Sequence, residues 1–174
     1  MTPEVTLRTA TAADAGFIAE MLAEAASWDR PPHEAPPALA DLLAEPRVAD
    51  YIEDWGRSGD AGVIAAIGDR PVGACWMRCF TADHPGYGFL GADVPGIGLA
   101  VVPESRGSGT GRRLLEALIE AADERGAGVI GLSVAEANSA ARALYEHFGF
   151  VVVGREGGSL TMRLDLVSDA THDL

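Results

Sequence analysis

The chain has 174 residues, of which 48% are apolar and 22% are charged, a composition typical of one soluble globular domain. All 13 basic residues are arginine, which excludes a Walker lysine, a Schiff-base lysine and a pyridoxal-phosphate anchor. The formal net charge is −13 without a long basic cluster, and this argues against nucleic-acid binding, because such binding depends on neutralising phosphates.

The first residues, MTPEVTLRTATAADAG, lack the basic segment and apolar run of a secretion signal. No run of about eighteen apolar residues follows, so we expect a cytoplasmic protein that does not contact a membrane. A short strand is predicted over 5–9, where apolar and polar residues alternate. Thr11 and Asp14 have the spacing of a capping box and are expected to begin a helix with an apolar face from Phe17 to Ala25.

The segment RPPHEAPP (30–37) contains four prolines, which end this first helix. Two further helical stretches are expected, over 39–43 and over 46–55. In the second of these, Pro46 suits the first helical turn, and Tyr51 and Trp55 fall on its apolar face.

Two apolar runs, AGVIAAI and PVGACWMRCF, flank GDR and predict a β-hairpin over 61–80. Cys75 and Cys79 lie in the second run, and four residues of strand separate their Cα atoms by about 13 Å, too far for a disulfide. We therefore expect two reduced core thiols, with a catalytic cysteine pair as the alternative. The segment 81–96 is dense in turn residues, and its length favours a functional or mobile loop.

The second half of the chain alternates strands and helices. Its predicted elements are an apolar strand over 97–102 buried on both faces, a helix over 110–125, a strand over 128–134, a second helix that carries Leu144, Tyr145 and Phe148, and a hairpin of 150–154 with 160–166. Gly126 is expected to end the first of these helices, and Asn138 and Gly149 are expected to cap and to end the second. This order of strands and helices predicts an α+β fold in a single domain over residues 1–174. Its seven-stranded sheet is expected to be mostly antiparallel, with a central parallel pair joined by a crossover helix.

The loop RGSGTGRR (106–113) lies between an apolar strand and a helix. Backbone N–H groups at such a junction are unpaired and lie at the positive end of the helix dipole. Glycines at 107, 109 and 111 remove the Cβ atoms that would keep a diphosphate away, and Arg106 and Arg112 can add charge-assisted hydrogen bonds. The loop therefore predicts a diphosphate site; the alternative is a glycine-rich turn with solvated arginines.

Two common classes of diphosphate-binding loop fit this sequence poorly. A Walker loop requires a lysine, and a dinucleotide fold requires G-x-G-x-x-G, whereas the spacing here is G-x-G-x-G. The next strand, which ends LSVAEAN, also offers no acid before Glu136 to hold a ribose. Coenzyme A is the remaining candidate, and a dinucleotide-dependent oxidoreductase stays as an alternative.

Two motifs resemble the signatures of the GNAT superfamily of N-acetyltransferases. LAVVPESRGSGTGRRLLEAL is similar to its acyl-CoA-binding pattern R/Q-x-x-G-x-G/A, with Arg106, Gly109 and Gly111 at the defining positions. NSAARALYEHFGF (138–150) is similar to the second signature, N-x-x-A-x-x-L-Y-x-x-x-G-F. The resemblance implies a GNAT-like fold in which the central parallel strands splay apart.

The resemblance also implies residue roles. Acetyl-CoA, as co-substrate, would bind through its pantetheine arm to the fourth strand, through its diphosphate to the glycine loop, and near the start of the last helix; no metal is expected. The implied cofactor-binding residues are Leu99, Ala100, Val101, Arg106, Gly107, Ser108, Gly109, Thr110, Gly111, Arg112 and Asn138. Tyr145 would return a proton to the departing thiolate, or would merely pack beside Leu144 and Phe148.

The general base departs from the family pattern. Many relatives carry a glutamate on the fourth or fifth strand as the general base. Here the fourth strand reads IGLAVV and the fifth reads GVIGLSV, and neither contains an acid. Ser133 occupies the position on the fifth strand where some relatives have that glutamate. We therefore expect a remote base that acts through water. The candidates are Asp93, His84, Glu53 and Glu136.

The implied activity is transfer of an acetyl group from acetyl-CoA to a primary amine by direct attack, with a backbone N–H such as that of Val101 holding the oxyanion. A non-catalytic module that senses acyl-CoA is the alternative. The acceptor would be an amine-bearing small molecule or peptide, and a homodimer is compatible with the resemblance. Acceptor sites of such proteins correspond here to 27–37, 47–60, 81–96 and 154–159, where aromatic residues (Trp28, Trp55, Tyr87 and Phe89) suit an apolar amine or simply pack in the core.

Overall fold

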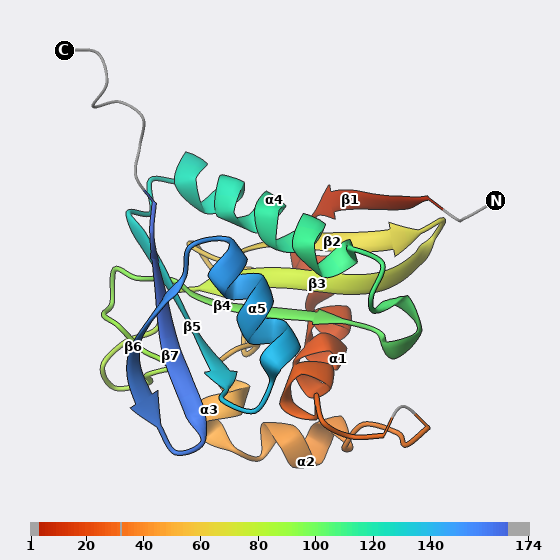
Figure 1. Cartoon of the computed structure of the whole chain (residues 1–174), viewed down its shortest axis with the longest axis horizontal. Coiled ribbons are helices and arrows are strands. Elements are labelled where there is room, and N and C mark those ends of the chain that lie inside the picture. The colour runs from red at the N-terminus through yellow and green to blue at the C-terminus, as the bar shows by residue number, and fades with distance from the viewer. Residues whose placement is uncertain (1–3, 32, 167–174) are drawn as a thin grey trace.

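A seven-stranded sheet in the order β1-β2-β3-β4-β5-β7-β6 runs through the computed structural model, which describes residues 4–31 and 33–166 (Figure 1). The strands are β1 (Val5–Thr9), β2 (Ala61–Ile67), β3 (Arg70–Arg78), β4 (Gly96–Val101), β5 (Val129–Ala135), β6 (Val151–Glu156) and β7 (Ser159–Asp165). The α-helices are α1 (Ala15–Ala26), α2 (Leu39–Leu43), α3 (Pro46–Ala49), α4 (Thr110–Glu124) and α5 (Ser139–His147), and short 3₁₀ turns η1 (Ala12–Asp14) and η2 (Pro103–Ser105) precede α1 and α4. The single domain expected over 1–174 includes terminal residues outside the described ranges.

The two central strands, β4 and β5, are parallel and diverge along their length. Their register is limited to Gly96↔Gly131, at the start of β4, whereas β5 pairs with β7 along its whole length, from Val129↔Asp165 to Ala135↔Ser159. The other neighbouring strands are antiparallel. The predicted α+β fold is therefore confirmed, including the splayed central pair joined by α4.

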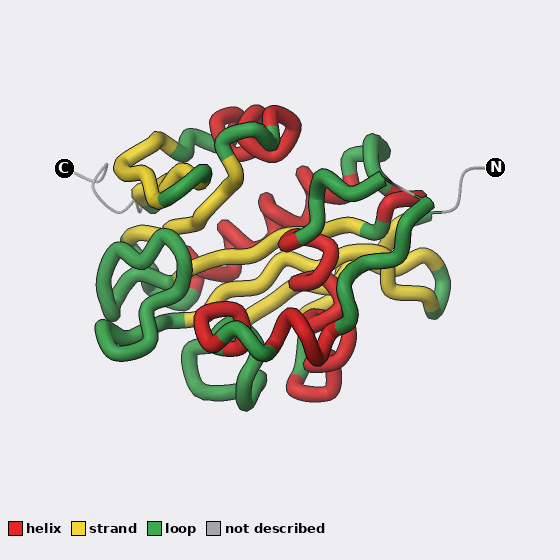
Figure 2. The backbone as a smooth tube through the Cα atoms, turned by 90° about the horizontal axis from the view of Figure 1, so that it is seen from below, coloured by secondary structure: helices red, strands yellow, loops and turns green. Residues whose placement is uncertain are grey.

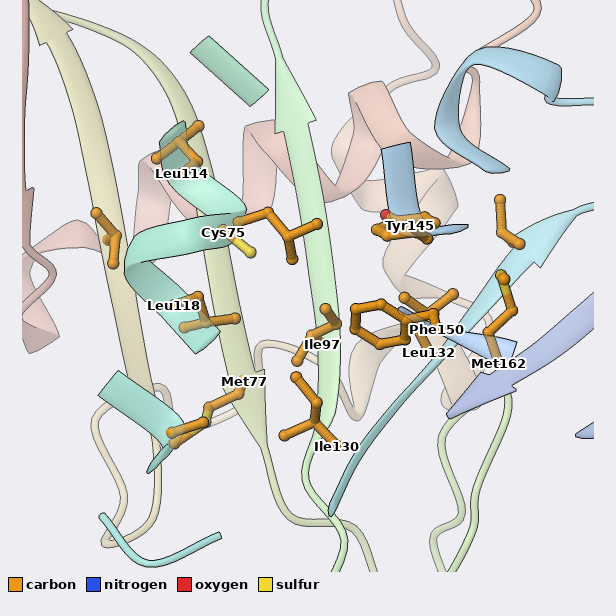
Figure 3. Close-up of a cluster of buried hydrophobic side chains, with 14 of the residues drawn as sticks. Cys75, Met77, Ile97, Leu114, Leu118, Ile130, Leu132, Tyr145, Phe150 and Met162 are labelled. Carbon is orange, nitrogen blue, oxygen red and sulfur yellow. The ribbon is translucent and has the colours of Figure 1, made fainter. Parts of the chain in front are cut away.

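Helices cover both faces of the sheet. Successive side chains of a strand point to opposite sides, so apolar side chains on both sides have to be buried. Val63 of β2 packs in one cluster with Leu114 of α4, and the adjacent Ile64 packs in the other cluster with Ile18 of α1. Figure 2 shows the strands lying between these helical layers, and Figure 3 shows the side chains of the α4 face.

Local caps fix the ends of the helices as predicted. The Thr11 side chain and the Asp14 carboxylate form the capping box before α1, and the Asn138 side chain accepts a backbone N–H of α5 at 3.2 Å. Gly126 and Gly149 follow α4 and α5 with φ angles of 82° and 99°, the left-handed conformation that ends many helices.

The third predicted helix is shorter than its sequence pattern. We expected a helix over 46–55, but α3 ends at Ala49 and the chain continues as turns. The buried Arg78 guanidinium donates to the carbonyls of Asp50 at 3.0 Å and Glu53 at 2.7 Å. This tertiary contact binds the Asp50 carbonyl, which a helix continuing to Trp55 would have bonded to the N–H of Asp54, and the Glu53 carbonyl, which would have had no partner in the last turn of that helix.

Two burial expectations need correction. Cys75 is a buried core thiol as expected, but Cys79 follows the end of β3 and is exposed. Burial raises the pKa of the Cys75 thiol, which disfavours the thiolate that a catalytic cysteine needs. β4 is not buried on both faces, because Leu99 is half-buried where β5 diverges. No helix within the described ranges is both long and apolar enough to cross a membrane.

Candidate active site

The gap between β4 and β5 opens into a cleft of about 580 Å³. Its walls come from the end of α1, from β4 and the following loop, from β5 and from α5. Eight of the twelve predicted site residues line it, namely Leu99, Ala100, Val101, Arg106, Gly107, Gly111, Asn138 and Tyr145. The structure therefore brings the two sequence motifs to one site.

The glycine loop has a left-handed backbone conformation at two positions, which residues other than glycine rarely adopt. Gly107 and Gly109 have φ angles of 78° and 86°, and an added Cβ would meet no protein atom within 4 Å at either position. Gly109 is the residue before the first turn of α4. The Ser108 hydroxyl donates to the Ser105 carbonyl at 2.7 Å and pins the loop from within. The open space beside left-handed glycines fits a ligand that approaches the backbone closely.

Four predicted loop residues do not line the cleft: Ser108, Gly109, Thr110 and Arg112. Thr110 is buried, and its hydroxyl lies 3.0 Å from that of Ser108, so its side chain supports the loop. Arg112 is exposed. These side chains shape or flank the loop rather than form the cleft wall.

Arg106 is already engaged by the protein. Its Nε donates to the Val101 carbonyl at 3.0 Å, and its Nη2 donates to the Glu24 carboxylate at 3.2 Å. Glu24 is itself only 7% exposed and lines the cleft. Glu24 is not among the predicted site residues, because it lies in the alanine-rich run AEMLAEAA and no motif marks it.

The register of β4 decides which of its backbone groups face the cleft. The Val102 N–H donates to Val72 of the β3 side at 2.8 Å. Directions alternate along a strand, so Ala100 also points toward β3, while Leu99 and Val101 point toward the gap. The predicted backbone contact of Ala100 with the ligand therefore does not fit, and the contacts of Leu99 and Val101 do.

Tyr145 lies at the inner wall of the cleft and is 7% exposed. Its ring meets the ring of Phe150 edge to face, and Figure 3 shows both rings beside Ile97 of β4 and Leu132 of β5. Burial, with a smaller contribution from Cys75, raises the pKa of the Tyr145 phenol above its ordinary value. The phenol is therefore held in its protonated form.

Three of the four predicted acceptor segments meet beside the β6–β7 hairpin. The guanidinium of Arg47 lies 4.0 Å from the centre of the Tyr87 ring and pairs with Glu156. The Tyr51 hydroxyl donates to the Tyr87 carbonyl at 3.1 Å. Trp28, in the remaining segment 27–37, instead lines the cleft.

The four candidate bases all lie outside the cleft lining. His84 is exposed, 3.6 Å from Asp50, and Asp93 and Glu53 are exposed as well. Glu136 pairs with Arg155 at 2.7 Å. None of the four is therefore placed to take a proton directly from an amine in the cleft.

Comparison with known proteins identifies the family. A family model described as the acetyltransferase (GNAT) family matches residues 20–150. The chain belongs to the GNAT family of acetyltransferases. The matched range of the GNAT model contains both motifs and every wall of the cleft described above, and the resemblance inferred from the sequence is confirmed.

Curated acetyltransferases match over shorter segments. A mycothiol acetyltransferase from Kocuria rhizophila is 42% identical over 86 residues, which are 47% of this chain and 26% of that protein. A [ribosomal protein bS18]-alanine N-acetyltransferase from Escherichia coli K12 is 46% identical over 52 residues, which are 30% of this chain and 35% of the relative. The chain thus spans about a quarter to a third of the length of these relatives.

Solved structures of acetyltransferases match nearly the whole chain. A ribosomal-protein-alanine N-acetyltransferase from Brucella melitensis has a TM-score of 0.66 at 25% identity and covers 92% of this chain and 99% of its own. The putative acetyltransferase yncA from Salmonella typhimurium with acetyl-CoA has a TM-score of 0.63 at 22% identity, over 95% and 96% of the two chains. The PaiA N-acetyltransferase from Thermoplasma acidophilum with coenzyme A has a TM-score of 0.66 at 15% identity, over 94% and 99%. The latter two support the fold.

Proposed function

We propose that this GNAT protein is an N-acetyltransferase that uses acetyl-CoA and acetylates a primary amine by direct attack. The observation that carries the proposal is the single cleft in which the glycine loop, the free edge of β4 and Tyr145 meet. Similar structures hold acetyl-CoA or coenzyme A, and the relative from Escherichia coli is named for acetylating an alanine amine.

The donor would bind along β4 with its diphosphate at the glycine loop. Gly107 and Gly111 line the cleft without side chains, so backbone N–H groups at the start of α4 can approach phosphate oxygens. Leu99 offers backbone groups to the pantetheine arm, and the N–H of Val101, whose carbonyl is bonded to Arg106, is left for the acetyl end of the donor. Asn138 lines the same cleft at the start of α5. The cleft therefore offers suitable partners along the length of the donor.

Two groups of the chain would assist the transfer. As the amine nitrogen bonds to the acetyl carbon, the N–H of Val101 would hold the negative charge that develops on the acetyl oxygen. The attacking nitrogen, which becomes positively charged as it bonds, would lose its second proton to water. As the carbon–sulfur bond breaks, the Tyr145 hydroxyl would give its proton to the sulfur and recover one from solvent. The raised pKa of Tyr145 supports this role, because the phenol stays protonated at neutral pH.

The acceptor amine would lose its proton to water in the cleft, since the four candidate carboxylate and imidazole bases lie outside it. Glu24 does line the cleft, but both of its oxygens accept hydrogen bonds from arginines. The acceptor would enter past Trp28, between the α1 end and the segments that meet at Arg47 and Tyr87.

Ligand-dependent stability tests the donor assignment. Acetyl-CoA at 100 times its dissociation constant should stabilise the fold by about 2.7 kcal/mol, which raises the melting temperature by about 5–10 °C for a chain of this size. NADH and ATP should have much smaller effects. Equal shifts with all three ligands would remove the assignment, and release of thiol with a panel of primary amines separates an enzyme from a sensing module.

A pair of matched glycine variants locates the site. Gly107 and Gly68 both have positive φ angles and open space around the missing Cβ, so Gly107→Ala and Gly68→Ala should each cost about 1–2 kcal/mol of folding stability. Because only Gly107 lines the cleft, only Gly107→Ala should weaken acetyl-CoA binding, by about tenfold or more. Equal affinity in the two variants would place the donor elsewhere.

A further inference from the structure

A single buried carboxylate joins two loops on the α1 side of the cleft. Both oxygens of Glu24 accept hydrogen bonds from Arg30, each at 2.9 Å, and Oε2 also accepts one from Arg106 at 3.2 Å. The Glu24 side chain is 9% exposed, and the Arg30 side chain is 12% exposed. This bidentate geometry, in a site that excludes most water, is the strong form of an arginine–carboxylate pair.

On one side, Glu24 fixes the turn that follows α1. Arg30 uses its remaining donors within that turn, with Nε bonding the Glu34 carbonyl at 2.8 Å and Nη1 bonding the Ser27 hydroxyl at 2.9 Å. Trp28, the cleft-lining residue of this segment, lies between the two anchored positions Ser27 and Arg30. The orientation of the turn therefore depends on the Glu24–Arg30 pair.

On the other side, Glu24 fixes the first residue of the glycine loop. Arg106 is held between the Glu24 carboxylate and the Val101 carbonyl. Gly107, the next residue, lines the cleft. The Arg106 side chain is 41% exposed, so packing restrains it only in part. Its hydrogen bonds to the Glu24 carboxylate and the Val101 carbonyl therefore supply much of the remaining restraint.

We propose that Glu24 is a positioning residue that couples the turn after α1 to the glycine loop, so that Arg30, which lies outside the cleft lining, affects donor affinity. The inference rests on the proposed function, because it takes coenzyme A as the ligand of the loop. Glu24 acts through Arg106 and has no role in the chemical step.

The charges around Glu24 predict that loss of its carboxylate weakens donor binding. The buried Glu24 carboxylate lies between two guanidinium groups, and without its charge these two cations would repel each other. Arg106 would then leave the Val101 carbonyl, and the loop would lose its preformed conformation. A preorganised loop binds more tightly, because less ordering is required on binding.

The test measures coenzyme A affinity by calorimetry in Glu24→Gln, Arg30→Gln and the double variant. Glu24→Gln should weaken binding by about tenfold and Arg30→Gln by about three- to tenfold. The double variant should match Glu24→Gln within about twofold, because Arg30 acts through Glu24. Amide hydrogen exchange of Arg30 and Glu34 should slow on coenzyme A binding in the wild type and not in Glu24→Gln.

Arg8→Gln is the matched control. Arg8 forms a bidentate pair with Asp14 at the other end of α1, at 2.8 and 2.7 Å, away from the cleft lining. This variant should lower folding stability and leave coenzyme A affinity within about twofold of the wild type.

Three results would overturn the inference: unchanged affinity in Arg30→Gln, additive effects in the double variant, or tighter binding in Glu24→Gln. The last result would mean that Glu24 competes with the diphosphate for Arg106. If the wild type fails to bind coenzyme A, the proposed function fails instead. The link is then tested by a double-mutant cycle of Arg30→Gln and Arg106→Gln in urea unfolding, where additive effects would refute it.

Discussion

The ring of Tyr145 meets the ring of Phe150 edge to face, with centroids 5.6 Å apart and planes inclined by 62°. Phe150 is 2% exposed and belongs to the α4-side core. The contact holds the Tyr145 ring against the core, and Tyr145 also lines the cleft. Packing and the proposed proton transfer therefore depend on different atoms of one side chain.

Removing only the hydroxyl separates these two roles. In Tyr145→Phe, the ring contact and coenzyme A affinity should survive, while turnover should fall by about 10²–10⁴-fold, the usual contribution of general acid catalysis. The measurement is kcat and KM for acetyl-CoA with an accepted amine. Turnover within about threefold of the wild type would mean that water protonates the thiolate and that Tyr145 only packs.

The pH profile tests how protons leave and arrive. Because burial raises the pKa of Tyr145, its protonated, active form should persist above the ordinary tyrosine pKa of about 10. Activity should therefore rise with pH as the acceptor ammonium loses its proton. It should not decline again at any pH up to about 10.

Two acceptor amines of different pKa provide the control for this profile. If water takes the proton, the midpoint of the rising limb of kcat/KM should move with the pKa of the acceptor. A midpoint that stays fixed for both amines would reveal a protein base, and a falling limb near neutral pH would count against Tyr145 as the acid.

The buried pair of Arg78 and Asp60 should be the most costly ion pair to break. Two hydrogen bonds of 2.9 and 2.8 Å join them, and the two side chains are 1% and 4% exposed. Arg78→Met should destabilise the fold by about 3–5 kcal/mol, because it leaves Asp60 as a buried unpaired charge. Urea unfolding measures this loss, with the exposed Arg163→Gln as a control that should change stability by about 0.5 kcal/mol or less.

The same pair has a predictable pH dependence. Burial opposes ionisation of Asp60, but hydrogen bonds from Arg78 and from the N–H groups of Gly56 and Arg57 outweigh it, so the pKa of Asp60 lies below its usual value. The stabilisation is therefore complete above the unfolded pKa of about 3.9 and is lost as the pH falls through the folded pKa. The effect of Arg78→Met should be full at neutral pH and smaller in acid; an equal effect at both would contradict the assignment.

The sequence by itself determined the features that depend on neighbouring residues. The Thr11–Asp14 capping box, the Asn138 cap and the left-handed Gly126 and Gly149 were predicted because each is a bond or a backbone preference within one turn. The glycine loop belongs to the same class. Two such motifs in order were enough to indicate the family and the walls of the cleft that β4, the glycine loop and α5 form.

Tertiary structure decided the features that join distant residues. Tyr51 and Trp55 keep a helical spacing, yet α3 stops at Ala49, because Arg78 binds the carbonyls that follow and Asp54 adopts a φ of 53°. Glu24 meets Arg106 across 82 positions of sequence, and only the packing of α1 on the sheet brings the two together. The free edge of β4 likewise follows from its divergence from β5, since the pairing of a strand depends on its neighbours in the sheet and not on its own residues.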